Sequence, residues 1–215
     1  MSRSNPSSAL YSSQKRPEPP SFLRRLFSVD ELFSLLKSLL LPHEMYESVE
    51  EIHLETLYQR GYRTILVDID NTLMTYEEKR ASLEKLNWIV YCKSLGFKVF
   101  AVSNNSDQRR IENVCKQLDI KGIYFACKPF SFATKELAQD HFIDLKKTIV
   151  VGDQVFKDVA MGHWLRCYTI LVEPIDVRFS LLKRVQRDVE LFLLRKLLIG
   201  DTVGLVLLII RTHFF

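Results

Sequence analysis

One pattern constrains the fold of this chain more than any other: short apolar runs alternate with segments of helical periodicity between residues 61 and 176. The runs predict strands, at residues 64–68, 98–103, 122–126, 148–151 and 167–172. The segments between them predict helices, at residues 81–95, 107–118 and 131–142 and directly after Asp158. Strands that are apolar throughout must be covered on both faces. We therefore expect a Rossmann-like α/β fold, with a parallel sheet between two helical layers.

Two carboxylates follow the first of these strands. Asp68 and Asp70 stand at positions i and i+2 after the apolar run 64–67. Both are therefore expected at the carboxyl end of a buried strand, which is the edge of an open α/β sheet where ligands bind. One carboxylate can attack phosphorus while a second one moves the proton. The pair predicts phosphoryl-transfer chemistry.

Polar residues follow three later strands in the same way. They are Ser103 with Asn104, then Lys128, then Asp153, with Asp158 five residues further on. Parallel strands bring their carboxyl ends to one edge, so these side chains are expected to converge on one crevice. Each group alone is a common turn or surface signal. Their order, strand-end placement and chemistry together indicate an active site.

Phosphoryl transfer needs each of these residue types. A phosphomonoester dianion repels a carboxylate nucleophile, and Mg²⁺ held by carboxylate oxygens of Asp68 and Asp153 would offset that repulsion. The hydroxyl of Ser103, the amide of Asn104 and the ammonium of Lys128 match the donors that stabilise charge on the transferring oxygens.

The remaining two carboxylates have supporting roles in this scheme. Asp70 is expected to protonate the leaving alkoxide and then to take a proton from the water that cleaves the aspartyl-phosphate. Asp158 is expected to hold either Lys128 or a metal-bound water.

These motifs resemble those of the haloacid dehalogenase (HAD) superfamily. The resemblance is carried by Asp68-Ile69-Asp70-Asn71-Thr72-Leu73, Ser103-Asn104-Asn105, Lys128-Pro129 and Gly152-Asp153-Gln154. The short gaps between the motifs leave no room for a cap domain, which resembles the capless subfamily IIIA. Over residues 41–194 the chain is similar to the YqeG family, which is related to the mitochondrial phosphatidylglycerophosphate phosphatase.

The resemblance implies a role for each motif. It implies that Asp68 is the nucleophile and Asp70 the acid/base, and that Ser103 and Lys128 bind phosphate. It further implies a Mg²⁺ site at Asp68, Asp70 and Asp153, with a phosphorylated substrate.

Segments outside the expected core (61–176) differ in composition. Residues 1–21 are rich in Ser and Pro and predict a disordered tail, although a basic, acid-poor start is also typical of an organelle presequence. Residues 22–60 predict an N-terminal helical segment with an amphipathic helix over 22–41. Residues 177–215 predict a C-terminal tail with a basic amphipathic helix, followed by a short apolar stretch.

The sequence leaves the position of these terminal helices open. They can lie in a membrane interface, pack on the core, form a hairpin with each other, or bind a partner. Charged residues interrupt the apolar run 22–41, so it is not expected to span a membrane.

Three functions remain in competition. The leading hypothesis is a Mg²⁺-dependent phosphatase acting on a lipid phosphate at a membrane surface, such as phosphatidylglycerophosphate. The alternative is a soluble phosphatase for a sugar phosphate or nucleotide, and the third is a catalytically silent interaction module. The mild net charge of +4 does not indicate a nucleic-acid partner.

We expect a cytoplasmic protein at the membrane periphery, with a mitochondrial or other organelle location as the alternative. The oligomeric state is not predicted.

Overall fold

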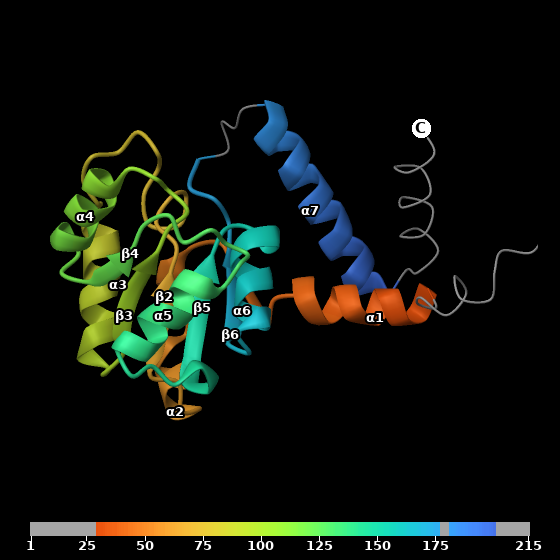
Figure 1. Ribbon diagram of the computed structural model, residues 1–215, viewed down its shortest axis with the longest axis horizontal. Helices are drawn as coiled ribbons and strands as arrows, with labels where there is room; N and C mark the ends of the chain where they lie inside the picture. Colours follow the sequence, from red (N-terminus) through yellow and green to blue (C-terminus); the bar gives the residue numbers. More distant parts are fainter. Residues whose placement is uncertain (1–28, 177–180, 201–215) are drawn as a thin grey trace, which may run out of the picture.

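The computed structural model describes residues 29–176 and 181–200. These residues form a six-stranded parallel sheet with strand order β1-β6-β5-β2-β3-β4 (Figure 1). The strands are β1 (Glu44–Tyr46), β2 (Thr64–Val67), β3 (Lys98–Val102), β4 (Lys121–Ile123), β5 (Thr148–Gly152) and β6 (Tyr168–Val172). The expected parallel α/β fold is confirmed.

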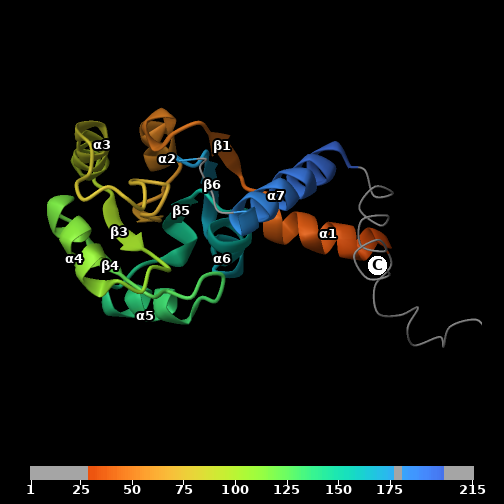
Figure 2. The same cartoon turned by 90° about the horizontal axis from the view of Figure 1, so that it is seen from above.

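Helices lie on both faces of the sheet, as Figure 2 shows for α2 and α3 on one side and α5 and α6 on the other. They are α1 (Val29–Leu40), α2 (Leu54–Gln59), α3 (Leu83–Ser94), α4 (Gln108–Gln117), α5 (Phe132–Asp140), α6 (Ala160–Trp164) and α7 (Leu181–Ile199). A π-helix, η4 (Val155–Val159), leads into α6. Short 3₁₀ turns lie at Val49–Glu51 and Leu145–Lys147.

Two apolar layers sandwich the sheet, because successive side chains of a strand point to opposite faces. In β2, Ile65 and Val67 pack into the layer under α2, α3 and α4, whereas Leu66 packs into the layer under α5 and α6. The near-continuous apolar strands of the sequence therefore correspond to a sheet buried on both sides.

Strand β1 was not predicted, and it lies within the segment 22–60 that was expected to be helical. Its three residues are too few to show a strand periodicity, and its place is fixed by parallel pairing with β6, where Met45 aligns with Leu171. Strand β4 also ends earlier than the predicted residue 126. Beyond its end at Ile123, Phe125 and Cys127 adopt left-handed backbone conformations, with φ of 49° and 55°, which a β-strand does not contain.

The terminal helices contact each other and the core. Helix α1 covers residues 29–40 of the predicted helix 22–41, and α7 extends to residue 199. They lie together beyond the β1 edge of the sheet (Figures 1 and 2), where Leu40, Leu194 and Leu197 share an apolar cluster with η4. No helix among the described residues is long and apolar enough to cross a bilayer. The predicted tail 1–21 and residues 201–215 lie outside the described part of the chain.

Candidate active site

Four strand ends bring the expected residues to one edge of the sheet. Asp68 follows β2, Ser103 follows β3, and Asp153 follows β5; Lys128 lies in the loop between β4 and α5. Strand β2 pairs in register with both β3 and β5, so the loops that follow these three strands start at the same level. The topology therefore creates the crevice that the sequence predicts.

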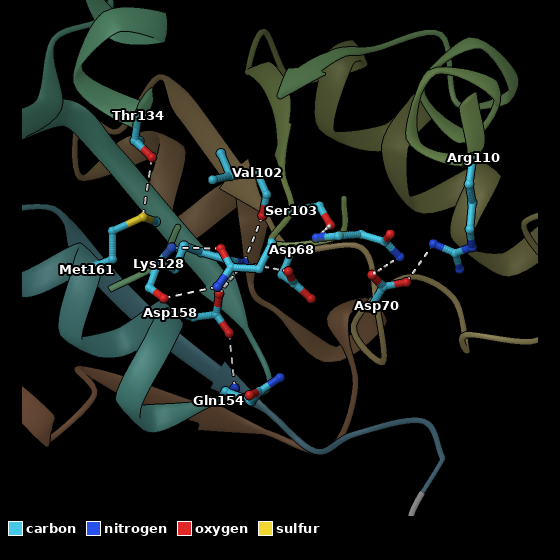
Figure 3. A network of polar contacts seen from close by, with 12 residues as sticks. Asp68, Asp70, Val102, Ser103, Arg110, Lys128, Thr134, Gln154, Asp158 and Met161 are labelled. Carbon is cyan, nitrogen blue, oxygen red and sulfur yellow. Dashed lines mark hydrogen bonds and ion pairs between the residues drawn. The ribbon is translucent and has the colours of Figure 1, made fainter. Parts of the chain in front are cut away.

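Lys128 is the centre of a buried ion cluster. Its Nζ donates hydrogen bonds to Asp68 Oδ1 at 2.5 Å, to Asp158 Oδ1 at 2.7 Å and to the carbonyl of Val102 at 2.8 Å (Figure 3). The lysine is 5% exposed, and both carboxylates are buried as well. Three acceptors use all three ammonium protons, which fixes the position of the charge. Of the two partners expected for Asp158, Lys128 is the one that it contacts here.

Burial and charge shift the pKa values in this cluster. Burial is the main cause that raises the pKa of Asp68, to about 7, and the neighbouring charge of Asp158 raises it further, against the opposing effect of Lys128. The pKa of Asp153 is raised by burial and by repulsion from Asp68 and Asp158. For Lys128, burial would lower the pKa, but the two carboxylates outweigh it and the net pKa is raised. The site holds more negative charge than its one buried lysine neutralises.

Two buried carboxylate oxygens have no hydrogen-bond partner, Oδ2 of Asp68 and Oδ1 of Asp153. Unpartnered buried oxygens cost free energy unless a ligand satisfies them. Among the described residues, no group of three or more His, Cys, Asp and Glu side chains could hold a metal ion. A Mg²⁺ ion, however, needs only one or two carboxylates besides waters and substrate phosphate. The donor set of Asp68 and Asp153 therefore fits Mg²⁺.

Gly152 allows Asp158 to reach the cluster. A Cβ atom at position 152 would lie 2.2 Å from Cγ of Asp158, which leaves no space for a side chain. Asp158 Oδ2 also accepts a hydrogen bond from the main-chain N–H of Gln154 at 3.1 Å. The Gly-Asp pair of the sequence motif thus places two carboxylates at the site. Asp153 supplies one itself, and Gly152 leaves the space that Asp158 occupies.

Asp70 lies apart from the lysine cluster and has its own partners. Its Oδ1 accepts a hydrogen bond from Nη1 of Arg110 at 2.6 Å, and its Oδ2 accepts one from Nδ2 of Asn105 at 3.0 Å (Figure 3). Arg110 is anchored in turn by donating from Nη2 to the carbonyl of Thr75 at 2.9 Å. Arg110 was not predicted as a site residue. It lies in the first turn of α4, after the N-cap Asp107, and nothing in that local pattern indicates a contact with Asp70.

The two expected phosphate-binding residues after β3 have different surroundings. Ser103 is fully buried, and its Oγ accepts a hydrogen bond from the N–H of Asn105 at 3.0 Å, which leaves the hydroxyl proton able to donate. The side chain of Asn104 holds the main chain of Lys128, accepting from its N–H at 2.7 Å and donating to its carbonyl at 3.0 Å. Both groups of the Asn104 amide are therefore in contact with the main chain of Lys128, and its expected contact with phosphate stays a prediction.

An open pocket of about 290 Å³ lies over the cluster. It is lined by Asp68, Asp70, Tyr76, Asn104, Asn105, Ser106, Lys128, Gln154 and Lys157. Tyr76 was not predicted, and burial, followed by the charge of Asp70, raises its pKa to about 12. The nucleophile candidate, the acid/base candidate and the buried lysine thus share one pocket that opens to solvent.

Comparison with known proteins identifies the family. Residues 27–176 match the family model described as mitochondrial PGP phosphatase. The chain belongs to this family. One relative, "Probable phosphatase YqeG" of Bacillus subtilis (strain 168), is 33% identical over 156 residues, which are 73% of this chain and 90% of the relative. "Phosphatidylglycerophosphate phosphatase 1, chloroplastic/mitochondrial" of Arabidopsis thaliana is 24% identical over 175 residues, 74% of this chain and 49% of the relative.

A solved structure is similar to part of the chain. It is an uncharacterized protein from Listeria monocytogenes serotype 4b, with 19% identity, a TM-score of 0.45, and coverage of 62% of this chain and 99% of that one. Membership of the PGP phosphatase family makes the chain a HAD-type phosphatase, as the resemblance implied. The family match ends at residue 176, before α7 begins at Leu181.

Proposed function

We propose that this phosphatase hydrolyses a phosphomonoester through an aspartyl-phosphate on Asp68, uses Mg²⁺, and acts on a lipid phosphate such as phosphatidylglycerophosphate. One observation carries the proposal. Asp68 is buried at the floor of an open pocket, with one oxygen on Lys128 and the other without a partner. A carboxylate in that arrangement has a free oxygen to attack phosphorus and a cation beside it to stabilise the transferring oxygens.

The residues divide the reaction into two displacements. In the first, the free oxygen of Asp68 bonds to phosphorus while the ester P–O bond breaks, and Asp70 gives a proton to the departing alkoxide. In the second, Asp70 takes a proton from a water that attacks phosphorus, the bond to Asp68 breaks, and inorganic phosphate leaves. Arg110 keeps the carboxylate of Asp70 in place for both proton transfers.

In this proposal the unpartnered Oδ1 of Asp153 would hold Mg²⁺ together with the Asp68 carboxylate, through the Asp68 oxygen that does not attack phosphorus. Arg110 and Asn105 already bind both carboxylate oxygens of Asp70, so any contribution from Asp70 comes from its main-chain oxygen. When bound, Mg²⁺ offsets the repulsion between the carboxylates and the phosphate dianion.

Two features support a lipid substrate. The pocket has no cap, since the described chain between Asp68 and Lys128 contains only α3, β3, α4 and β4 with their loops. An open site can meet a headgroup that remains in a bilayer. The Arabidopsis relative is named as a phosphatidylglycerophosphate phosphatase, which supports the same substrate class here.

The outward face of α7 supports contact with a membrane. It exposes the apolar residues Val185, Val189, Leu191, Phe192, Leu198 and Ile199. The basic residues Arg184 and Arg195 are exposed on the same helix. Such a surface can lie at the boundary of headgroups and acyl chains, where each basic residue adds about 1 kcal/mol of attraction to anionic lipid.

Turnover on a substrate panel tests the proposed chemistry. Phosphatidylglycerophosphate in mixed micelles, a sugar phosphate and a nucleoside monophosphate are compared with Mg²⁺ and with a chelator. We expect the highest kcat/KM on the lipid and loss of turnover with the chelator. Preference for a water-soluble substrate would replace the lipid proposal by the alternative phosphatase, and no turnover on any phosphomonoester would favour the silent module.

Vesicle flotation tests the membrane contact separately. We expect the full chain to float with anionic vesicles and the double variant Val189→Asp/Phe192→Asp to remain at the bottom. Phe142→Asp, which places a charge at an aromatic residue that is 92% exposed in the turn after α5, is the matched control and should float. Equal flotation of both variants would show that α7 does not make the membrane contact. A peripheral position at a cytoplasmic or mitochondrial membrane is compatible with this proposal, and the name of the Arabidopsis relative favours the organelle.

A further inference from the structure

Helix α7 carries a buried carboxylate that the proposed reaction does not use. Glu190 is 1% exposed, and burial raises its pKa. Its Oε1 accepts hydrogen bonds from the main-chain N–H of Phe156 at 3.2 Å and from Nε2 of Gln186 at 3.1 Å. A buried carboxylate is costly unless its partners compensate for the lost hydration. Its partner Phe156 lies in the first turn of η4, where main-chain N–H groups have no partner within the helix.

An arginine on the same helix reaches the residue that we propose as the metal ligand. Nη1 of Arg187 donates to the main-chain carbonyl of Asp153 at 3.0 Å. Its Nη2 donates to Glu173 Oε2 at 2.6 Å, just after β6. The Arg187 side chain is 12% exposed, whereas that of Glu173 is 55% exposed, so the buried part of this connection is the contact with Asp153. Arg187 therefore ties α7 to the carboxyl ends of β5 and β6.

A third contact completes the connection. Nε2 of Gln186 donates to Oε1 of Gln154 at 3.3 Å. Together, α7 contacts the segment 153–156 at three points, and the main-chain N–H of Gln154 within it also binds Asp158. The segment 153–156 thus forms hydrogen bonds both with α7 and, through Asp158, with the lysine cluster.

The seam between α7 and the site contains a small cavity of about 20 Å³. It is lined by Asn71, Tyr76, Asp153, Gln154, Gln186, Arg187 and Glu190. Two buried oxygens without a partner belong to residues of this lining, Oδ1 of Asp153 and Oδ1 of Asn71. The cavity is large enough for about one ordered water. The inner face of α7 therefore lines the same cavity as Asp153, the proposed metal ligand.

We propose that α7 is part of the active site, with Arg187 and Glu190 acting as positioning residues that hold the segment 153–156 and so place the Asp153 carboxylate for Mg²⁺. This inference rests on the proposed function only in taking Asp153 as a metal ligand. It assigns a role to a helix that lies beyond the family match over residues 27–176. Residues that orient metal ligands through a hydrogen bond typically change metal affinity or activity by 10- to 100-fold when they are removed.

The test compares Glu190→Gln and Arg187→Met with Asp188→Asn in the full-length chain. Asp188 is exposed on the same helix, so its variant removes a charge without touching the segment 153–156. We expect the first two variants to need about tenfold more Mg²⁺ for half-maximal turnover, with a smaller change in kcat at saturating Mg²⁺. Asp188→Asn should match the unmodified protein.

A second readout does not depend on turnover. Mg²⁺ raises the Tm of a protein that binds it only when folded. We expect this Mg²⁺-dependent rise in Tm to shrink in Glu190→Gln and Arg187→Met at a fixed Mg²⁺ concentration. A purely structural role would lower the Tm equally with and without Mg²⁺. Unchanged Mg²⁺ requirement together with an unchanged rise in Tm would overturn the inference.

Two further variants distinguish a wrong metal site from a wrong role for α7. If Glu190→Gln does not fold, Glu173→Gln removes only the outer partner of Arg187 and should show a smaller shift in the same direction. Asp153→Asn tests the proposed function itself and should abolish the Mg²⁺ response. If Asp153→Asn retains that response, the proposed metal site is wrong; if it loses the response while the Arg187 variant keeps it, only the role of α7 is wrong.

Discussion

Asp68 and Asp70 are two residues apart in one loop, and both are buried, yet their surroundings differ. Asp68 shares the ammonium of Lys128 with Asp158, and one of its oxygens has no partner. Asp70 has both oxygens bound, one by Arg110 and the other by Asn105. The same side chain therefore occupies a crowded anionic cluster at one position and a fully satisfied site at the other.

The difference teaches how one loop can supply two chemical roles. A nucleophile needs an oxygen that is free to form a bond, and only Asp68 has one. A residue that moves a proton needs a fixed orientation beside the reacting atoms, and Arg110 with Asn105 gives Asp70 that orientation. Environment, rather than residue type, assigns the roles of paired carboxylates in hydrolases.

Removing the free oxygen should have the largest effect. We expect Asp68→Asn to lower kcat by about 10⁴-fold or more, because an amide cannot form the covalent intermediate. The fold should remain, since asparagine has the same shape and removes one charge from a cluster that is rich in carboxylates. Steady-state turnover with circular dichroism as a folding check measures this, and Asp140→Asn, an exposed carboxylate on α5, is the control. Turnover near that of the control would end the covalent proposal.

Removing the shared cation should have the next largest effect. Lys128→Met leaves Asp68 and Asp158 buried without their cation, which we expect to lower the free energy of unfolding by about 3–5 kcal/mol. Chemical denaturation measures the loss. The double variant Lys128→Met/Asp158→Asn should recover part of it, because the two residues are coupled. Full stability in the single variant would show that the cluster is not held by Lys128.

Loosening the other carboxylate should have a smaller effect. Arg110→Met leaves Asp70 with only Asn105, and a carboxylate displaced by about 1 Å can lose up to 10²-fold in rate. We expect kcat to fall by about 10- to 100-fold with the Mg²⁺ requirement unchanged. The neighbouring Arg109→Met is the matched control, since Arg109 is exposed and makes no contact with Asp70 among those observed. A changed Mg²⁺ requirement in Arg110→Met would mean that the two carboxylates are not independent.

The sequence predicts the part of this architecture that local patterns encode. Strand β2 and the carboxylates after it are visible because an apolar run ends where the polar residues begin. The N-cap at Asp107 is likewise a local signal, and its side chain accepts a hydrogen bond from the N–H of Arg110. Because the carboxyl ends of parallel strands lie at one edge of the sheet, the order of the strands is enough to predict that Lys128 lies near Asp68.

Contacts between distant segments could not be predicted in this way. Arg110 and Asp70 are 40 residues apart, and nothing in the helical pattern of α4 distinguishes Arg110 from Arg109. Glu190 looks like one acidic residue in a basic amphipathic helix, whereas its partner Phe156 belongs to η4. In both cases the tertiary arrangement selects the partner, so the side chains that orient the site remain hidden in the sequence.

The most gradual effect expected is the dependence of stability on pH in the Mg²⁺-free protein. Burial raises the pKa of Asp68 to about 7 from the ordinary value of 3.8. Between these values the folded state keeps a proton that the unfolded state has released, so the free energy of unfolding falls as pH rises. The contribution is complete below about pH 4 and is lost as the pH passes through about 7, with a slope of at most about 1.4 kcal/mol per pH unit.

Asp68→Asn should flatten this slope, because it removes the titrating group, and Asp140→Asn should leave it unchanged. Some slope should persist in Asp68→Asn, since the pKa of Asp153 is also raised by burial. Denaturation curves at pH 5, 6, 7 and 8 with a chelator measure the slopes of all three proteins. A slope in Asp68→Asn as steep as in the unmodified chain would mean that Lys128 keeps Asp68 ionised throughout this range. The contrast with Asp70 would then rest on geometry alone, on the oxygen that Asp68 leaves without a partner.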